Sequence, residues 1–207
     1  MKKYLVELIG TFFLVFTVGS TVVPPGAGPL APLAIGASLM VMIFAGGHVS
    51  GGHFNPAVSL AVWIRGKLST GDLLPYWLAQ CAAALLAAWA VHFFKPPGSA
   101  EPFAIGWKAA LLAEFIFTFA LAWVVLNVAT AKGTANNSFY GLAIGMTVMT
   151  GAFAVGNVSG GAFNPAVALG ITLMHLQTWN NLWVFLLGNF GGAAVAALPY
   201  QLVNGDE

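Results

Sequence analysis

Two copies of the tripeptide Asn-Pro-Ala are the residues of this sequence whose types and spacing point most directly to chemistry: Asn55-Pro56-Ala57 and Asn164-Pro165-Ala166. Asn is a preferred helix N-cap, and Pro fits the first helical turn because it has no N–H to leave unpaired. Each box therefore predicts a helix start, where the macrodipole places roughly half a positive charge. With the Asn oxygen committed to capping, its amide N–H₂ remains as a donor to an oxygen atom of a small solute.

The composition indicates an integral membrane protein, for which the lipid bilayer is the obligatory partner. Hydrophobic residues make up 59% of the 207 residues and charged residues 6%. No Asp, Glu, Lys or Arg occurs between residues 8 and 64 or between 133 and 205, so neither segment could cover itself against water. The formal net charge of +1 and the lack of a basic run give no reason to expect a nucleic-acid partner.

No metal or cofactor is predicted. Cys81 is the single cysteine, which rules out an internal disulfide, and we expect it to fill a small apolar packing position. The four His residues lack close metal-ligand spacing. A nucleophile, a base and an orienting partner are not grouped at any recognisable spacing, so an enzyme is not expected.

The stretch 33–60, which contains the first box, returns as 142–169 with 18 of 28 paired positions identical. The chain therefore consists of two internal repeats. Hydrophobic segments of about 20 residues, long enough to cross a bilayer, predict three crossings in each half, at about 4–23, 30–48, 73–94, 107–130, 138–156 and 182–202.

The segments around each box are too short to cross a membrane. We expect Val49–Phe54 to be a non-helical approach to the first box and a short helix to follow over Pro56–Ile64, with a matching short helix from Pro165. Non-helical backbone at membrane depth is tolerated only where it is buried in protein or lines a wet cavity. The Gly-rich segments before both boxes should therefore line a pore.

Three crossings in each half are an odd number, so the second half must enter the bilayer from the opposite side and the repeats are inverted. The two short helices then meet with their positive N-termini at the centre, where cations and protons encounter an electrostatic barrier. The positive-inside rule places both termini in the cytoplasm, and we expect a bacterial inner membrane. The cytoplasmic side carries Lys2, Lys3, Arg65, Lys67 and Lys132, and the other side Lys95 and Lys108.

The two boxes, together with Glu-x-x-x-Thr at Glu7–Thr11 and Glu114–Thr118, resemble the aquaporin family of major intrinsic proteins. The resemblance implies six tilted transmembrane helices plus two re-entrant half-helices in an all-α membrane fold, one pore per subunit, and usually a homotetramer. The chain would then be a single domain over 1–207, with repeats at 1–97 and 103–207.

The sequence departs from the family pattern directly after the second box. Most members carry an Arg there, in a narrow extracellular filter, whereas this chain has Val167. Carrying the family pattern over by position assigns Ile35, Ala152, Gly161 and Val167 to the filter, which should be wide and apolar. It resembles filters of some plant vacuolar and bacterial metalloid channels. We expect a passive, bacterial-type channel for water and small uncharged solutes such as glycerol, urea, hydrogen peroxide, ammonia or arsenite.

Three ionisable residues need separate interpretation. Glu7 and Glu114 lie at membrane depth, which flags function by default. In the family the equivalent carboxylates hold the re-entrant loops by hydrogen bonds to their backbone, so we expect support and not proton transfer. His53, two residues before Asn55, resembles a His that faces the lumen near the cytoplasmic side in many members.

Two other classes of function stay open at this point. Inverted repeats, broken helices, Glu7, Glu114 and His53 also suit a proton- or ion-coupled transporter of a small solute, whose flux would collapse with an uncoupler. Some family members are structural or adhesive membrane proteins, and such a protein would show no osmotic response.

Overall fold

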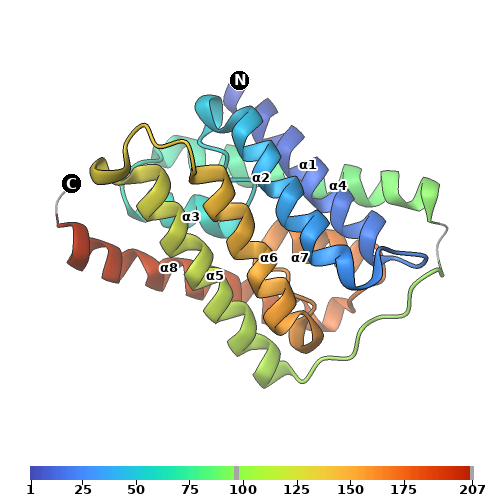
Figure 1. The fold of residues 1–207 in the computed structure, drawn as a ribbon. Coiled ribbons are helices and arrows are strands. Elements are labelled where there is room, and N and C mark those ends of the chain that lie inside the picture. The colour runs from blue at the N-terminus through green and yellow to red at the C-terminus, as the bar shows by residue number, and fades with distance from the viewer. Residues whose placement is uncertain (96–97, 206–207) are drawn as a thin grey trace.

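The computed structural model describes residues 1–95 and 98–205, and within these ranges the regular structure is entirely helical (Figure 1). Three short 3₁₀ turns, at Gly28–Leu30, Lys132–Thr134 and Trp179–Asn181, join some of the α-helices. The six long helices are α1 (Lys2–Val22), α2 (Ala31–Ser50), α4 (Thr70–Phe94), α5 (Trp107–Thr130), α6 (Tyr140–Ser159) and α8 (Leu182–Asn204). The two short ones are α3 (Pro56–Ile64) and α7 (Pro165–Leu173).

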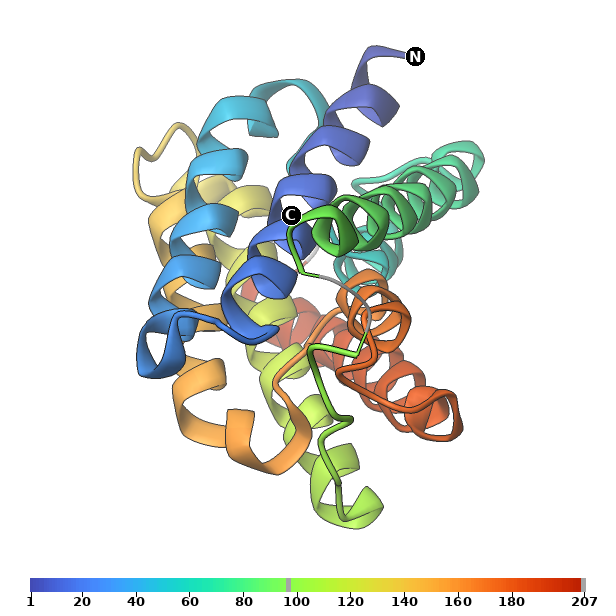
Figure 2. The same ribbon diagram turned by 90° about the vertical axis from the view of Figure 1, so that its right-hand side faces the viewer.

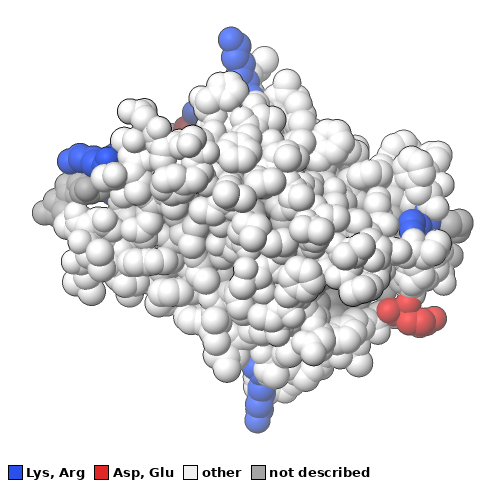
Figure 3. Space-filling view, viewed as in Figure 1, with Lys and Arg blue, Asp and Glu red and all other residues white. Residues whose placement is uncertain are grey.

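All six long helices are long and apolar enough to cross a membrane, which confirms the predicted fold class. Their outer faces carry exposed large apolar side chains such as Leu78, Trp89 and Leu187. On the face in Figure 3, Lys, Arg, Asp and Glu side chains lie only near the rim, and the surface between them is uncharged. Such a belt suits contact with lipid and not with water.

The structure corrects where two crossings end. We predicted that they stop near His48 and Gly156, but α2 continues to Ser50 and α6 to Ser159. The helices end two and three residues beyond the predicted positions because Gly51 and Gly160 take left-handed backbone angles, φ 90° and φ 95°, that form a C-terminal cap. The non-helical approach to each box is therefore shorter than the sequence suggested. The predicted repeat boundary at Pro97 lies outside the described residues.

The helix contacts repeat across the two halves. The pairs α1–α4 and α5–α8 pack extensively, and α1–α2 has its counterpart in α5–α6. Each half-helix also packs against the other repeat: α3 contacts α5 and α8, whereas α7 contacts α1 and α4, as Figure 2 shows for α7 beside α4. This crossed arrangement brings the starts of α3 and α7 into contact at the centre of the molecule.

Helices α2 and α6 cross at two glycines that correspond in the repeats. A Cβ on Gly145 would lie 2.5 Å from the carbonyl oxygen of Gly36, and a Cβ on Gly36 would lie 2.6 Å from the Cβ of Met149. Small residues permit such close backbone approach in membrane helix pairs. The crossing therefore brings the backbones of the two repeats into direct contact.

Candidate functional site: the paired half-helices and the central cavity

Both short helices begin with the same cap. The Asn55 side-chain oxygen accepts hydrogen bonds from the backbone N–H groups of Ala57 at 2.9 Å and Val58 at 3.4 Å. Asn164 caps α7 with the same two distances, to Ala166 and Val167. Pro occupies the first helical turn in both cases. The caps leave each side-chain amide facing the other repeat.

Each cap amide also donates across the repeat boundary. Asn55 Nδ2 donates to the Phe163 carbonyl at 2.9 Å, and Asn164 Nδ2 donates to the Phe54 carbonyl at 2.8 Å. Both Phe residues have left-handed backbone angles, φ 47° and φ 48°, which are uncommon for a bulky residue. From the sequence, we expected the whole N–H₂ group to be available to a solute. One hydrogen is committed across the repeats, which leaves one hydrogen per Asn.

A buried carboxylate holds the loop before each box. Oε1 of Glu114 accepts from the Ser159 hydroxyl at 2.7 Å and the Ala162 N–H at 3.0 Å. Oε2 accepts from the Phe163 N–H at 2.7 Å and from Asn189 Nδ2 at 2.7 Å. Hydrogen bonds to an ionised group are the stronger kind. Four donors converge on one side chain, and two of them are backbone groups that lead into the second box.

Glu7 makes the same set of bonds in the first repeat. It accepts from Ser50 at 2.7 Å, from the backbone N–H groups of His53 at 2.9 Å and Phe54 at 2.7 Å, and from Gln80 at 2.8 Å. Sequence reasoning named the carboxylates but missed the two Ser residues. The duplicated Ser-Gly-Gly at the end of each crossing was the available signal, because a hydroxyl there can reach both the loop and the carboxylate.

His53 is buried and fixed on two sides. Its Nδ1 lies 3.0 Å from the Ser59 hydroxyl, and its ring centroid lies 5.1 Å from that of Tyr76. Ser59 in turn accepts from Gln80 Nε2 at 3.0 Å and donates to the Asn55 carbonyl at 3.1 Å. This network connects the imidazole through Gln80 to the Glu7 carboxylate, which holds the loop before the first box. Sequence reasoning found His53 but not Ser59.

A narrow cavity runs beside both boxes. Its polar lining residues are His53, Asn55 and Asn164. The rest of its lining is apolar or Gly: Leu14, Val18, Ile35, Leu39, Val58, Leu121, Ile144, Val148, Gly161, Ala162 and Val167. Of the predicted filter residues, Ile35, Gly161 and Val167 line this cavity. Ala152 is not among the lining residues, but it lies next to one of them, since a Cβ on Gly161 would be 3.5 Å from the Ala152 Cα.

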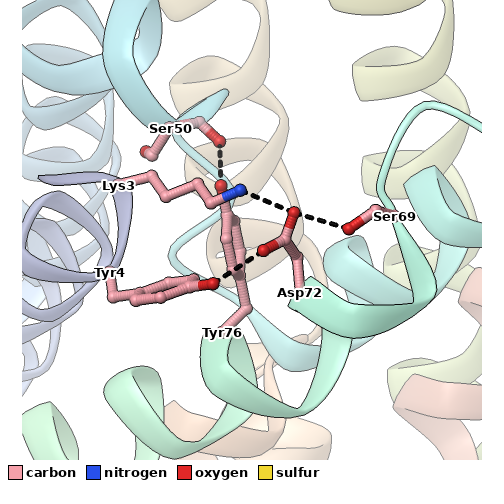
Figure 4. A network of polar contacts seen from close by, with 6 residues as sticks. All are labelled: Lys3, Tyr4, Ser50, Ser69, Asp72 and Tyr76. Atoms are coloured by element: carbon pink, nitrogen blue, oxygen red, sulfur yellow. Dashed lines mark hydrogen bonds and ion pairs between the residues drawn. The ribbon is translucent and has the colours of Figure 1, made fainter. Parts of the chain in front are cut away.

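A second, wider cavity opens at the end of the molecule where α1 and α4 begin, and we call it the vestibule. Figure 4 shows the polar network on its wall: Asp72 accepts from Lys3 Nζ at 2.6 Å, from the Ser69 hydroxyl at 2.6 Å and from the Tyr4 hydroxyl at 2.7 Å. Beside it, the Tyr76 hydroxyl donates to the Ser50 carbonyl at 2.7 Å. These bonds tie the start of α4 to the start of α1 and to the end of α2.

Within residues 1–95 and 98–205, no group of three or more His, Cys, Asp and Glu side chains is arranged to hold a metal ion. The site combines two capped helix starts, two carboxylates that hold the loops, one imidazole and an apolar wall. Such an arrangement offers hydrogen-bond donors to a neutral solute.

The sequence matches one protein family over nearly its whole length. The model of the family described as Major intrinsic protein matches residues 1–200. The chain belongs to the major intrinsic protein family. It is 35% identical over 217 residues to "Glycerol uptake facilitator protein-like 6" of Lactiplantibacillus plantarum, covering 100% of both chains. It is 36% identical to "Aquaporin NIP1-4" of Oryza sativa subsp. japonica, covering 98% of this chain and 77% of that protein.

A solved structure shows the same fold. The X-ray structure of the aquaglyceroporin from Plasmodium falciparum superimposes with a TM-score of 0.82 and covers 98% of this chain and 96% of that one, at 23% identity. Membership of the major intrinsic protein family makes this chain a passive, non-enzymatic membrane channel for water and small solutes.

Proposed function

We propose that the channel passes water together with small uncharged solutes, in the size range of urea, glycerol, hydrogen peroxide, ammonia and arsenite, and excludes protons and ions. The observation that supports this most is the lining of the central cavity, whose polar members among the described residues are only His53, Asn55 and Asn164. An apolar wall with a short row of polar groups can hold one small solute by its oxygen atoms while its carbon atoms contact the wall.

The filter that we propose consists of Ile35, Ala152, Gly161 and Val167. Val167 follows the second box and lines the cavity, so an apolar group occupies the position where most family members carry Arg. Val is shorter than Arg and uncharged, which leaves a wider ring with no fixed positive charge. Similarity to proteins named as a glycerol uptake facilitator and an aquaglyceroporin supports solute passage beside water.

Ion exclusion follows from the two helix starts. The N-termini of α3 and α7 contact each other beside the cavity, and each contributes roughly half a positive charge. Asn55 and Asn164 retain one free amide hydrogen each after the cap and the bond across the repeats. A solute there meets donors and a positive potential, which opposes protons and cations.

The runner-up function, proton- or ion-coupled transport, needs a carboxylate that can bind and release its cargo. Glu7 and Glu114 are fully buried, and each accepts four hydrogen bonds from its own repeat. Each carboxylate oxygen already accepts two of these bonds, so protonation would have to displace at least one buried donor. This cost favours a supporting role and a passive channel.

We further propose that the chain forms a homotetramer in a bacterial inner membrane with both termini in the cytoplasm. Five of the seven Lys and Arg residues lie on the side of the termini in the six-crossing arrangement, in agreement with the positive-inside rule. Native mass spectrometry tests the assembly, and protease access to the C-terminus in inverted membrane vesicles tests the orientation.

Stopped-flow light scattering on proteoliposomes tests the filter. We expect wild-type protein to pass glycerol and urea, and Val167→Arg to pass water but little of either solute. Val203→Arg is the matched control, because Val203 is exposed near the end of α8 and does not line the cavity. If the wild type passes water alone, the proposed solute function is wrong.

A further inference from the structure

The inverted repeat gives the central cavity an internal symmetry that can be followed residue by residue. Residues that correspond in the two halves line it together: Ile35 with Ile144, Leu39 with Val148, Val58 with Val167, Asn55 with Asn164 and Leu14 with Leu121. The filter proposed above, which we call the outer ring, therefore has a counterpart nearer the vestibule. By sequence correspondence this inner ring consists of Ile144, Ile43, Gly52 and Val58, of which Ile144 and Val58 line the cavity and Ile43 lies next to Gly52.

The two rings share a local geometry. A Cβ on Gly161 would lie 3.5 Å from the Ala152 Cα, and a Cβ on Gly52 would lie 3.6 Å from the Ile43 Cα. Both glycines have left-handed φ angles, 66° and 64°. The rings differ in bulk, because Ile43 stands where the outer ring has Ala152.

A second difference adds to the first. His53 and Ala162 correspond in the two repeats, and both line the central cavity. The partner that fixes the imidazole, Ser59, has Ala168 as its counterpart, so both members of this hydrogen-bonded pair are replaced by Ala in the other repeat. The first repeat therefore has a hydrogen-bonded pair that the second repeat lacks. This indicates that the pair has a role in the first repeat only.

The imidazole also lies at the junction of the two cavities. Among the described residues, His53 is the one that lines both the central cavity and the vestibule. It is 7% exposed, with Ser59 on one side and the Tyr76 ring on the other, so it has little freedom to turn away.

We propose that the inner ring together with His53, and not the outer ring that contains Val167, sets the upper size limit for solutes in this channel. This inference rests on the proposed function. Barriers in series add, and the narrowest one limits the flux. Widening the inner ring should therefore admit larger solutes, whereas modest narrowing of the outer ring should have little effect.

The test compares glycerol and water permeability of proteoliposomes by stopped-flow light scattering. His53→Ala reproduces the arrangement of the second repeat, and we expect it to raise the ratio of glycerol to water permeability about tenfold, equivalent to about 1.4 kcal/mol of barrier. Ser59→Ala keeps the imidazole but removes its fixed partner, and we expect a smaller rise. Ala168, the counterpart of Ser59 in the second repeat, shows that Ala is tolerated at this position of the repeat. Ser59→Ala can therefore serve as the test if His53→Ala fails to fold.

Ala152→Ile gives the outer ring the bulk of the inner one. As a single substitution, Ala152→Ile should change the ratio of glycerol to water permeability little. Combined with His53→Ala, it should cancel the rise in that ratio. His92→Ala is the matched control, because His92 lines neither cavity. A tenfold loss of glycerol flux in Ala152→Ile alone, or an unchanged ratio in both His53→Ala and Ser59→Ala, would overturn the inference.

The result also separates this inference from the proposed function. If wild-type protein passes water alone, the proposed solute function fails, but His53→Ala should then open a glycerol path. If His53→Ala also passes water alone, the inner ring does not set the limit and the inference is wrong. If wild-type protein passes glycerol and neither His53→Ala nor Ser59→Ala changes the ratio of glycerol to water permeability, the proposed function stands and the inference is overturned.

Discussion

Glu114→Gln removes the charge of one carboxylate clamp while keeping the size of the side chain. Three of the four groups that bind Glu114 are N–H donors with no lone pair to offer: the backbone of Ala162, the backbone of Phe163 and the amide nitrogen of Asn189. One lies on Oε1 and two lie on Oε2. Either orientation of the new amide therefore places an N–H₂ group against at least one donor.

The loss of folding stability in Glu114→Gln can be worked out from these hydrogen bonds. One buried donor without an acceptor costs about 1–3 kcal/mol, and each bond that changes from charged to neutral loses about 1 kcal/mol. These contributions are not fully additive within one network, so we expect a total destabilisation of about 2–5 kcal/mol. At about 2–4 °C per kcal/mol for a chain of this size, Tm should fall by roughly 5–15 °C.

Thermal unfolding in detergent measures this change, and stopped-flow water permeability should fall with it, because Ala162 and Phe163 lead directly into the second box. Glu7→Gln should behave alike, since its clamp has the same composition. Glu101→Gln is the control, because Glu101 is exposed, and it should stay within about 0.5 kcal/mol of wild type. Wild-type Tm and permeability in Glu114→Gln would refute an ionised clamp.

Three further predictions concern other parts of the fold. Asn55→Asp replaces an amide donor by a carboxylate opposite a backbone carbonyl of the other repeat; we expect a cation current in planar bilayers, and an electrically silent variant would contradict the role assigned to the caps. Gly145→Leu should abolish folding, because its Cβ would lie 2.5 Å from the facing α2 backbone, whereas Gly156→Leu has open space and should give a normal gel-filtration profile; equal yields would refute the close crossing. Lys3→Ala breaks a partly exposed ion pair with Asp72 and should lower Tm by less than about 3 °C, and by less still at high salt; a much larger fall would contradict this.

Much of the fold could be predicted because the strongest signals are local or duplicated. Apolar segments of about 20 residues specify the crossings, and the paired boxes specify two helix starts through the chemistry of Asn and Pro. The ends of α2 and α6 could not be placed correctly, because they depend on left-handed angles at Gly51 and Gly160. Several neighbouring glycines could have taken that role, and only the fold selects one.

The candidate site was less accessible to sequence reasoning wherever it depends on contacts between distant residues. The bond from Asn55 to the Phe163 carbonyl joins residues 108 apart in the chain and requires an unusual φ angle that Phe gives no reason to expect. The pairing of His53 with Ser59 depends on how the loop turns into α3, which local propensity does not determine. The duplicated sequence shows which residues of the two boxes correspond. It does not show which hydrogen bonds form between the two repeats, because these depend on the folded structure.

The most direct test of the central claim, passive conduction through one pore, is solute flux in proteoliposomes with and without an imposed pH difference. We predict that glycerol and urea equilibrate down their own gradients, at a rate that neither the pH difference nor a protonophore changes. Accumulation of either solute against its gradient, lost when the protonophore is added, would contradict this account and identify a proton-coupled transporter.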